Sequence, residues 1–300
     1  MNEKMQDLLN KIRGKEESLE NKKYDTQLLI EKMKEKTAMT AYKLEIRKDG
    51  YKPTLFESKF GGVPYWNLKE KYPVDSNGEK MMLLAQINFT EAKLDDDRLP
   101  NQGILQFFIA ANDDVYGMDF DEPDSQSNFR IIYHEEIDDT VTKEKILALG
   151  IPVNTDETLD LEYPPITEEL AISLNKTITY MGIEVCDFDR IFAEVVKDTL
   201  GMDIAGESAY SFLGNDEFDQ FCEELNDGGH WMLGYPYFTQ YDPRDNSEYY
   251  DTLLLQIDSE QGEETDYVMW GDCGVANFFI NSDALKKRDF SKVMYNWDCC

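Results

Sequence analysis

The sequence contains very little histidine, with only His134 and His230 among its 300 residues. General acid–base catalysis and zinc coordination both rely heavily on imidazole, so this scarcity argues against most hydrolase and zinc-enzyme mechanisms. The nucleophile-elbow, HExxH, phosphate-binding-loop and dinucleotide-binding motifs are also missing. We therefore expect no catalytic residues and no cofactor. Whether the protein is an enzyme stays open, and binding is the favoured interpretation.

Cysteines and long apolar runs are scarce as well. The five cysteines are an odd number, and no apolar run approaches the ~20 residues that a membrane-spanning helix needs. The first residues are polar and charged, unlike a secretory signal. These absences predict a cytoplasmic protein with free thiols and no membrane partner.

Positive charge is in short supply. The chain has 30 lysines and arginines against 61 aspartates and glutamates, which gives a formal net charge of −31. Such acidity repels phosphate backbones and anionic lipids, so no nucleic-acid partner is expected. It favours a basic protein partner or cations. The alternative is that the acidity only keeps the protein soluble.

One acidic run superficially resembles a calcium-binding loop. Asp119, Asp121, Glu122 and Asp124 form the pattern D-x-D-E-x-D over six positions. A calcium loop would place glycine at position six and glutamate at position twelve, where Arg130 stands instead. The metal ligands, if any, are therefore unknown, and binding of a divalent cation is one hypothesis among others.

Three apolar signatures in the first half return in the same order about 170 residues later. The first set is GVPYW at 62–66, LLAQIN at 83–88 and GILQFFI at 103–109. The second set is GYPYF at 234–238, LLLQID at 253–258 and GVANFFI at 274–280. A near-constant offset across three apolar signatures predicts a duplicated β-unit.

The predicted fold class is α+β, with internally duplicated β-rich repeats packed as one compact unit and with N-terminal and central helices. We expect an N-terminal helical segment over 1–37 and one domain over 38–300. That domain would comprise a first β-repeat at about 38–136, a helical connector at about 137–230 and a second β-repeat at about 231–300. Apolar patterns predict strands at 41–46, 83–89, 103–109, 129–133, 170–174 and 293–295.

Helical periodicity marks the N-terminus and the connector. One apolar stripe begins at Met5, and a second helix is expected to be capped by Asp25 or Thr26. Two further helices are expected, one between Asp187 and Gly201 and one from 215 to 228. The N-terminal helices would either bind a partner or pack back on the body.

Aromatic and polar side chains gather near the ends of the predicted strands. Two matching turns of the form Gly-x-Pro-aromatic could face each other across a cleft between the repeats. The candidate ligand- or partner-binding residues are Tyr65, Trp66, His230, Tyr237, Gln240, Trp270, Asp272 and Asn277. The alternatives are that the aromatic residues cap the core and that His230 simply bonds a loop carbonyl.

An ordered set of motifs resembles the YwqG-like family. The motifs include SKFGGVP at 58–64, LAQINF at 84–89, LGYP at 233–236, LLQID at 254–258, WGD at 270–272 and YNWDC at 295–299. The resemblance covers about residue 40 to the end. It implies a bacterial cytosolic α+β protein without an established activity, similar to accessory or immunity-type proteins near secreted-toxin genes. The family commonly has Trp-Pro after the first turn, whereas Asn67 follows Trp66 here.

Three functional hypotheses follow. The leading one is a non-enzymatic binding protein, of accessory or immunity type, that docks a basic protein through its acidic surface. The second is a small-molecule or sugar-binding module, with or without enzymatic activity, that uses the aromatic cleft. The third is a divalent-cation binder.

Overall fold

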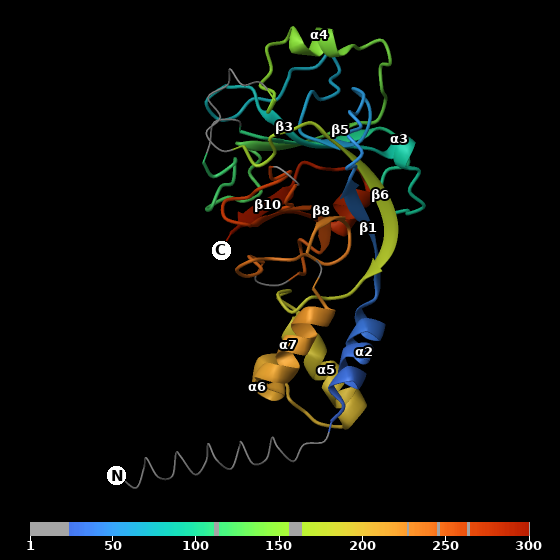
Figure 1. The fold of residues 1–300 in the computed structure, drawn as a ribbon, viewed down its shortest axis with the longest axis vertical. Helices are drawn as coiled ribbons and strands as arrows, with labels where there is room; N and C mark the ends of the chain where they lie inside the picture. The colour runs from blue at the N-terminus through green and yellow to red at the C-terminus, as the bar shows by residue number, and fades with distance from the viewer. Residues whose placement is uncertain are drawn as a thin grey trace, which may run out of the picture. The chain divides into compact units, whose positions relative to one another are not determined.

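The computed structural model describes residues 24–110, 114–155, 164–226, 228–244, 247–262 and 265–299 (Figure 1). The chain divides into two compact units. One combines Met1–Lys36 with Asp189–Glu224, and the other combines Thr37–Phe188 with Leu225–Cys300. The predicted helix at the beginning of the chain, around Met5, lies outside the described residues.

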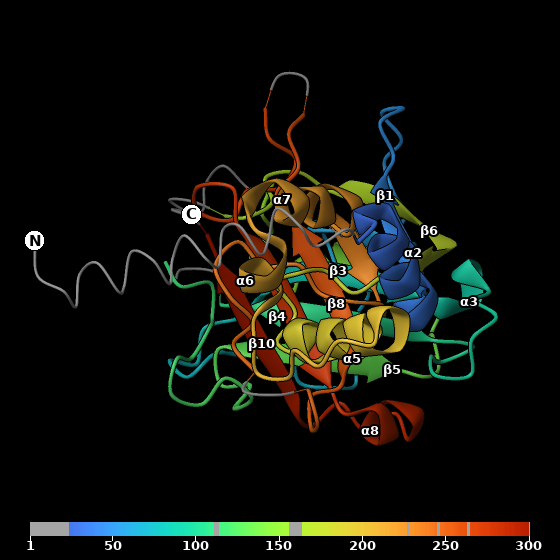
Figure 2. The ribbon, with the colours of Figure 1, turned by 90° about the horizontal axis from the view of Figure 1, so that it is seen from below.

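The smaller unit is helical. Its helices are α2 (Thr26–Thr37), α5 (Phe188–Leu200), α6 (Ala209–Leu213) and α7 (Asn215–Glu224) (Figure 2). Asp25 accepts hydrogen bonds from the N–H groups of Gln27 and Leu28 at 3.0 and 3.3 Å, so the predicted cap of α2 is confirmed. Phe192 of α5 packs edge to face against Phe221 of α7, with ring centroids 5.5 Å apart. The second expected N-terminal helix and the two expected connector helices thus share one unit.

The larger unit is built on a ten-stranded antiparallel sheet, counted over the described residues, in the order β10-β9-β8-β7-β1-β6-β2-β3-β4-β5. The strands are β1 (Met39–Ile46), β2 (Lys59–Phe60), β3 (Met82–Asn88), β4 (Ile104–Ile109), β5 (Phe129–His134), β6 (Leu170–Thr179), β7 (His230–Met232), β8 (Thr252–Asp258), β9 (Val275–Ile280) and β10 (Val293–Asp298). Three short helices, α3 (Phe89–Ala92), α4 (Lys143–Leu147) and α8 (Ser282–Lys286), lie between strands. The β-rich α+β class and the predicted strands are confirmed.

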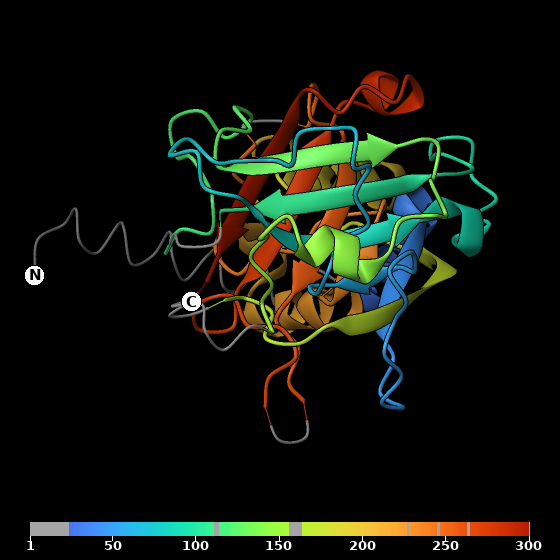
Figure 3. The same cartoon turned by 90° about the horizontal axis from the view of Figure 1, so that it is seen from above.

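The two longest strands join the halves of this sheet. β1 pairs along its whole length with residues 172–179 of β6. Each of the two has a very short strand from the other half of the chain as its second neighbour: β7 beside β1, and β2 beside β6. In Figure 1, β6 curves alongside β1 from one layer of the unit to the other. Figure 3 shows β4 and β5 lying over the layer that contains β8 and β10.

The main core fills the space between the two layers. Phe107 of β4 meets Phe278 of β9 with ring centroids 5.0 Å apart, and Phe278 stacks on Tyr295 of β10 at 4.5 Å. All three side chains are fully buried. Because successive side chains of a strand alternate between faces, the neighbouring Phe108 of β4 packs in a second cluster on the outer face of its layer.

Buried amide side chains hold the two Gly-x-Pro turns against the outer faces of the layers. Tyr65 donates its N–H to Gln86 Oε1 at 2.9 Å and accepts at its carbonyl from Gln106 Nε2 at 2.6 Å. Tyr237 donates to Gln256 Oε1 at 2.8 Å and accepts from Asn277 Nδ2 at 3.0 Å. Both layers also shift register at the matching places, between Leu83 and Ala85 and between Leu253 and Leu255. These bonds satisfy turn backbone that has no strand neighbour.

The central aromatic contact gives a direct test of this core. We expect Phe278→Ala to lower the free energy of unfolding by about 3–5 kcal/mol, because it removes a large side chain from between the layers. Phe120→Ala is the matched control, since that side chain is 76% exposed, and it should change the free energy by less than ~0.5 kcal/mol. Urea unfolding followed by fluorescence measures both. Equal effects of the two substitutions would contradict the layer arrangement.

Candidate functional site

A pocket of about 550 Å³ lies where the short strand β7 begins, between β1 and the end of β8. β7 pairs with β1 only as far as His230, opposite Leu44, whereas β1 continues to Ile46. The chain that leads into β7 is the Gly228–Gly229 pair, so the sheet has a gap beside these longer strands. We call this cavity the His230 pocket. It is lined by Lys43, Leu44, Glu45, Ile46, Lys48, Gly228, Gly229, His230, Asp258, Ser259 and Glu260.

The imidazole of His230 is buried and both of its nitrogens are engaged. Nδ1 lies 3.1 Å from the N–H of Asp258, which can only donate, so Nδ1 is the acceptor. The ring proton is therefore on Nε2, which donates to Glu260 Oε2 at 3.0 Å. The imidazole also packs edge to face with the ring of Phe60, and the two ring centroids are 5.0 Å apart. His230 thus has no free nitrogen with which to take a proton from a ligand.

Glu260 is the fixed negative charge of the pocket. The hydrogen bond from His230 lowers the pKa of Glu260 to about 2, and Lys48, whose Nζ lies 2.8 Å from Oε1, contributes to the same shift. Glu260 is therefore ionised at neutral pH. Its carboxylate has about four acceptor positions, so it can accept a further donor from a ligand.

Asp258 fixes the backbone at the entrance to β7. Its Oδ2 accepts from the N–H of Gly229 at 2.6 Å, and burial raises the pKa of its carboxyl group. The carbonyl of Gly229 accepts from Gln256 Nε2 at 2.8 Å, and that of Gly228 from Trp231 Nε1 at 3.2 Å. With φ at +106°, Gly229 adopts backbone that other residues avoid. This wall of the pocket is consequently preorganised.

The other half of the sheet has a smaller cavity, of about 260 Å³, beside its own short strand β2. There Ser58 Oγ accepts a hydrogen bond from the N–H of Asn88 at 2.9 Å. This bond corresponds to the one that His230 Nδ1 accepts from the N–H of Asp258. Residues 171–174 of β6 line this cavity as residues 43–46 of β1 line the other. Ser58 and His230 therefore occupy corresponding positions beside the two cavities, and the main difference is that one side chain is a hydroxyl and the other an imidazole.

A fully buried lysine lies at the start of β2. Lys59 Nζ donates to Glu169 Oε1 and to the carbonyl of Thr54, both at 3.0 Å. Burial lowers the pKa of Lys59, which the neighbouring Glu169 carboxylate partly offsets. Glu169 also pairs with Lys143 and accepts from the N–H of Val63. We interpret this ion pair as the anchor of the first Gly-Gly turn, because its bonds run to that turn and to the loop before β2.

The eight sequence-predicted site residues lie in several separate places. Tyr65 and Trp66 are buried on the outer face of the first layer, and Trp270 is in the main core. In the second layer, Asn277 donates a hydrogen bond to the carbonyl of Tyr237. Gln240 and Asp272 are exposed at the surface, and His230 lines the pocket. The structure therefore brings together Tyr65 with Trp66 and Tyr237 with Asn277, but it does not gather all eight around one cleft.

Sequence reasoning selected His230 and missed the charged residues around it. Lys48 and Glu260 come two residues after predicted β-segments and Asp258 is the last residue of one, so polar residues at strand ends are the available signal. No Phe, Tyr or Trp appears in the described lining of the pocket. The expected aromatic cleft is thus not the cavity that the structure presents.

The acidic run that resembles a calcium loop bonds within the protein. Asp119 Oδ1 accepts from the N–H groups of Asp121 and Glu122, both at 3.0 Å, and Asp124 bonds Tyr250 and Lys292. Within the described part of the chain, no three His, Cys, Asp or Glu side chains are placed to hold a metal ion. The hypothesis of a divalent-cation site therefore gains no support.

Comparison with known proteins identifies one family. A family model described as "Domain of unknown function (DUF1963)" matches residues 58–299. The match agrees with the expectation of a family without an established activity, although it does not carry the YwqG-like name. No curated protein matches the chain. Among the residues that the structure describes, no helix is both long and apolar enough to cross a membrane.

The His230–Glu260 bond predicts a pH-dependent stability. A folded pKa of about 2, below the ordinary 4.5, means that the stabilisation is complete above pH 4.5 and is lost as the pH falls towards 2. We expect Glu260→Gln to cost about 1–2 kcal/mol of unfolding free energy at neutral pH and progressively less in acid. Urea midpoints at several pH values measure the difference between the two proteins.

The control for this experiment is Glu45→Gln, which alters an exposed carboxylate in the same pocket. It should change the unfolding free energy by less than ~0.5 kcal/mol. A Glu260→Gln effect that stays constant from neutral to acid pH would contradict the assignment.

Proposed function

Since the chain belongs to the DUF1963 family, a domain of unknown function, we propose its function from the site itself: it is a non-enzymatic binding protein that takes a small zwitterionic molecule, such as an amino acid, in the His230 pocket. The observation that carries the proposal is the mixed charge of a preorganised cavity. Pockets of about 300–1,000 Å³ are typical of small-molecule sites, and this one measures about 550 Å³.

Binding is favoured over catalysis because of the state of the imidazole. A general base must be within hydrogen-bond reach of the proton that it abstracts. Both nitrogens of His230 are already occupied, by Asp258 and Glu260. The histidine then acts as a positioning group for the Glu260 carboxylate rather than as a proton acceptor.

The charges that line the pocket indicate the ligand class. Lys43 and Lys48 offer ammonium groups for a ligand carboxylate. Glu45, Asp258 and Glu260 offer acceptors for a ligand amine. A sugar would lack the stacking surface that aromatic side chains provide, so a zwitterion fits the described lining better.

We also propose that the two halves of the sheet arose by duplication. The matched amide bonds at Tyr65 and Tyr237, the matched register shifts and the paired cavities beside β2 and β7 support this interpretation. On this view the larger pocket differs from the smaller one because the second half has His230 where the first half has Ser58. Ligand binding would belong to the second half alone.

Docking of a basic protein is the second candidate function, and one surface feature favours it. Phe120 is 76% exposed, the largest exposure among the large hydrophobic side chains that the structure describes. It is flanked by Asp119, Asp121 and Glu122. Aromatic residues are enriched at protein interfaces, and the surrounding carboxylates would attract a basic partner.

Thermal shift with small zwitterions tests the leading proposal. Glycine, L-glutamate and L-lysine are the probes, and acetate and methylamine supply each charge alone. A ligand at a hundredfold excess over its Kd should stabilise the protein by about 2.7 kcal/mol. Lys48→Ala should weaken binding about tenfold, as expected for the loss of one charged contact of about 1.4 kcal/mol.

The matched control is Lys52→Ala. Lys48 and Lys52 are similarly exposed, at 61% and 65% of their side chains, and each pairs with one glutamate. Lys48 lines the pocket, whereas Lys52 does not. Equal loss of binding in both variants, or an equal shift with acetate alone, would refute the site.

Salt-dependent capture from a cell extract tests the docking function. We expect basic proteins retained by the native chain at low salt to be released at moderate salt, because exposed charges are screened. Phe120→Ala should abolish retention, whereas Tyr241→Ala, which removes another exposed aromatic side chain (69%), should not. Retention that survives Phe120→Ala would mean that general acidity alone attracts the proteins.

A further inference from the structure

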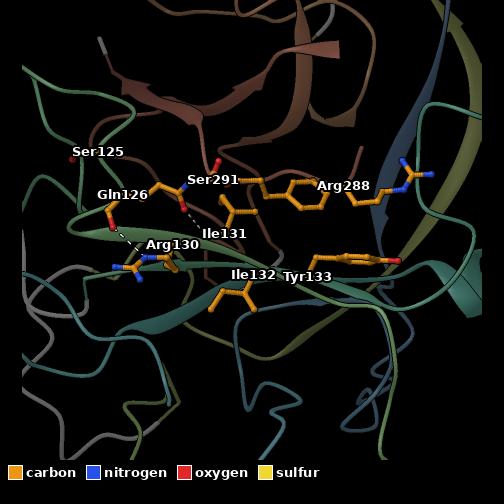
Figure 4. Close-up of a pocket in the computed structure, with 9 residues that line it drawn as sticks. Ser125, Gln126, Arg130, Ile131, Ile132, Tyr133, Arg288 and Ser291 are labelled. Atoms are coloured by element: carbon orange, nitrogen blue, oxygen red, sulfur yellow. Dashed lines mark hydrogen bonds between the residues drawn. The ribbon is translucent and has the colours of Figure 1, made fainter. Parts of the chain in front are cut away.

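A second cavity, of about 600 Å³, lies at the open edge of the sheet (Figure 4). β5 is the last strand on its side, and the groove separates it from Arg288, Phe290 and Ser291, which precede β10. In Figure 4, Gln126 and Arg130 lie at one end of the groove, and Tyr133 and Arg288 lie at the other. The groove is thus bounded by a strand edge along its length.

Unpaired backbone groups of β5 face this groove. Ile131 donates its N–H to the side chain of Gln126 at 2.9 Å, so that N–H points away from β4. Backbone groups of an edge strand alternate in direction, and therefore the N–H and C=O of Tyr133 and the C=O of Ile131 also point outward. Within the described residues these three groups have no hydrogen-bond partner. Such an edge is a template for another strand.

The side chain of Gln126 already imitates one unit of that missing strand. Its Oε1 accepts from Ile131, and its Nε2 donates to the carbonyl of Phe290 at 2.7 Å. The amide thereby bridges the two sides of the groove as a peptide group would. It occupies one hydrogen-bonding position of the edge and leaves the positions around Tyr133 open.

The groove is positively charged in a strongly acidic protein. Its lining includes Arg130 and Arg288 but no aspartate or glutamate, although the chain carries a net charge of −31. Arg130 donates to the carbonyl of Gln126 at 3.1 Å, and Arg288 donates to the carbonyls of Arg98 and Leu99. Among the described residues, these bonds go to neutral carbonyls, so no carboxylate neutralises either arginine.

We propose that this groove binds an extended acidic peptide segment of a partner protein, which adds to β5 as an extra strand. The backbone of the segment pairs with Ile131 and Tyr133, and this pairing supplies affinity without reading the sequence. Its carboxylates meet Arg130 and Arg288, and its alternate apolar side chains pack beside the half-buried Ile132 and Tyr133. The charge preference is opposite to that of the acidic remainder of the surface.

Fluorescence anisotropy with labelled ten-residue peptides tests the proposal on the full chain. The first probe alternates valine and glutamate, the second alternates valine and lysine, and the third is the acidic peptide with alternate amides N-methylated. The acidic peptide should bind, the lysine peptide should not, and N-methylation should weaken binding at least ~10-fold by removing the ladder bonds. Hydrogen exchange should show new protection in 129–134 when the acidic peptide is bound.

Two arginine variants separate the groove from general charge. Arg130→Gln should weaken the acidic peptide ~10-fold, the equivalent of one lost contact of about 1.4 kcal/mol. Arg190→Gln, which removes the same charge from the helical unit, should leave binding unchanged. Because the N-methylated peptide is compared on the native chain, the test does not depend on the folding of either variant.

Several results would overturn the proposal. Equal binding of the N-methylated peptide would mean that charge alone attracts it, and stronger binding of the lysine peptide would reverse the assigned partner. A peptide-free dimer that protects 129–134 would assign the edge to a second copy of the chain. Absence of new protection with the acidic peptide would place it elsewhere.

Discussion

The pairing of β1 with β6 is the constraint on which the larger unit depends. Eight residue pairs, from Met39 with Thr179 to Ile46 with Ile172, connect the two layers, and among the described strands no other pair joins them. The same two strands give β2 and β7 their neighbours. Since β2 and β7 are much shorter than the strands beside them, the sheet leaves a cavity at the end of each. The architecture thus produces sites as a by-product of unequal strand lengths.

Buried polar groups then determine what each cavity can do. A buried amide or charge is costly unless it is hydrogen-bonded, and here the glutamines, His230 and Lys59 all have partners within the unit. These partners hold the walls of the His230 pocket in place before any ligand arrives. At the opposite edge, Gln126 satisfies part of the backbone of β5 and leaves the rest uncovered. The His230 pocket is thus a preorganised cavity, whereas the β5 edge is a strand whose backbone hydrogen bonds are only partly satisfied.

Much of the fold could be predicted from local patterns, because short apolar runs such as 83–89 and 103–109 become buried strands whatever their neighbours are. The pairing of β2 with β6 could not, since periodicity contains no information on which strands meet. The same limit applies to the site. His230 was identifiable from its position before a turn, but its bond to Glu260 joins residues 30 apart in the chain. No sequence pattern predicted the buried ion pair of Lys59, because its partner Glu169 lies 110 residues away.

The helical unit is built from two segments that are far apart in the sequence, so its helices are synthesised at different times. α2 buries Leu29, Ile30 and Met33 completely, yet the helices of the same unit, α5 to α7, end only at Glu224. At ~5–20 residues per second, a ribosome needs roughly 10–40 s to make the intervening chain. Until α5 is made late in that interval, α2 has none of its later companions, and its apolar side chains lack the partners that bury them in the folded unit.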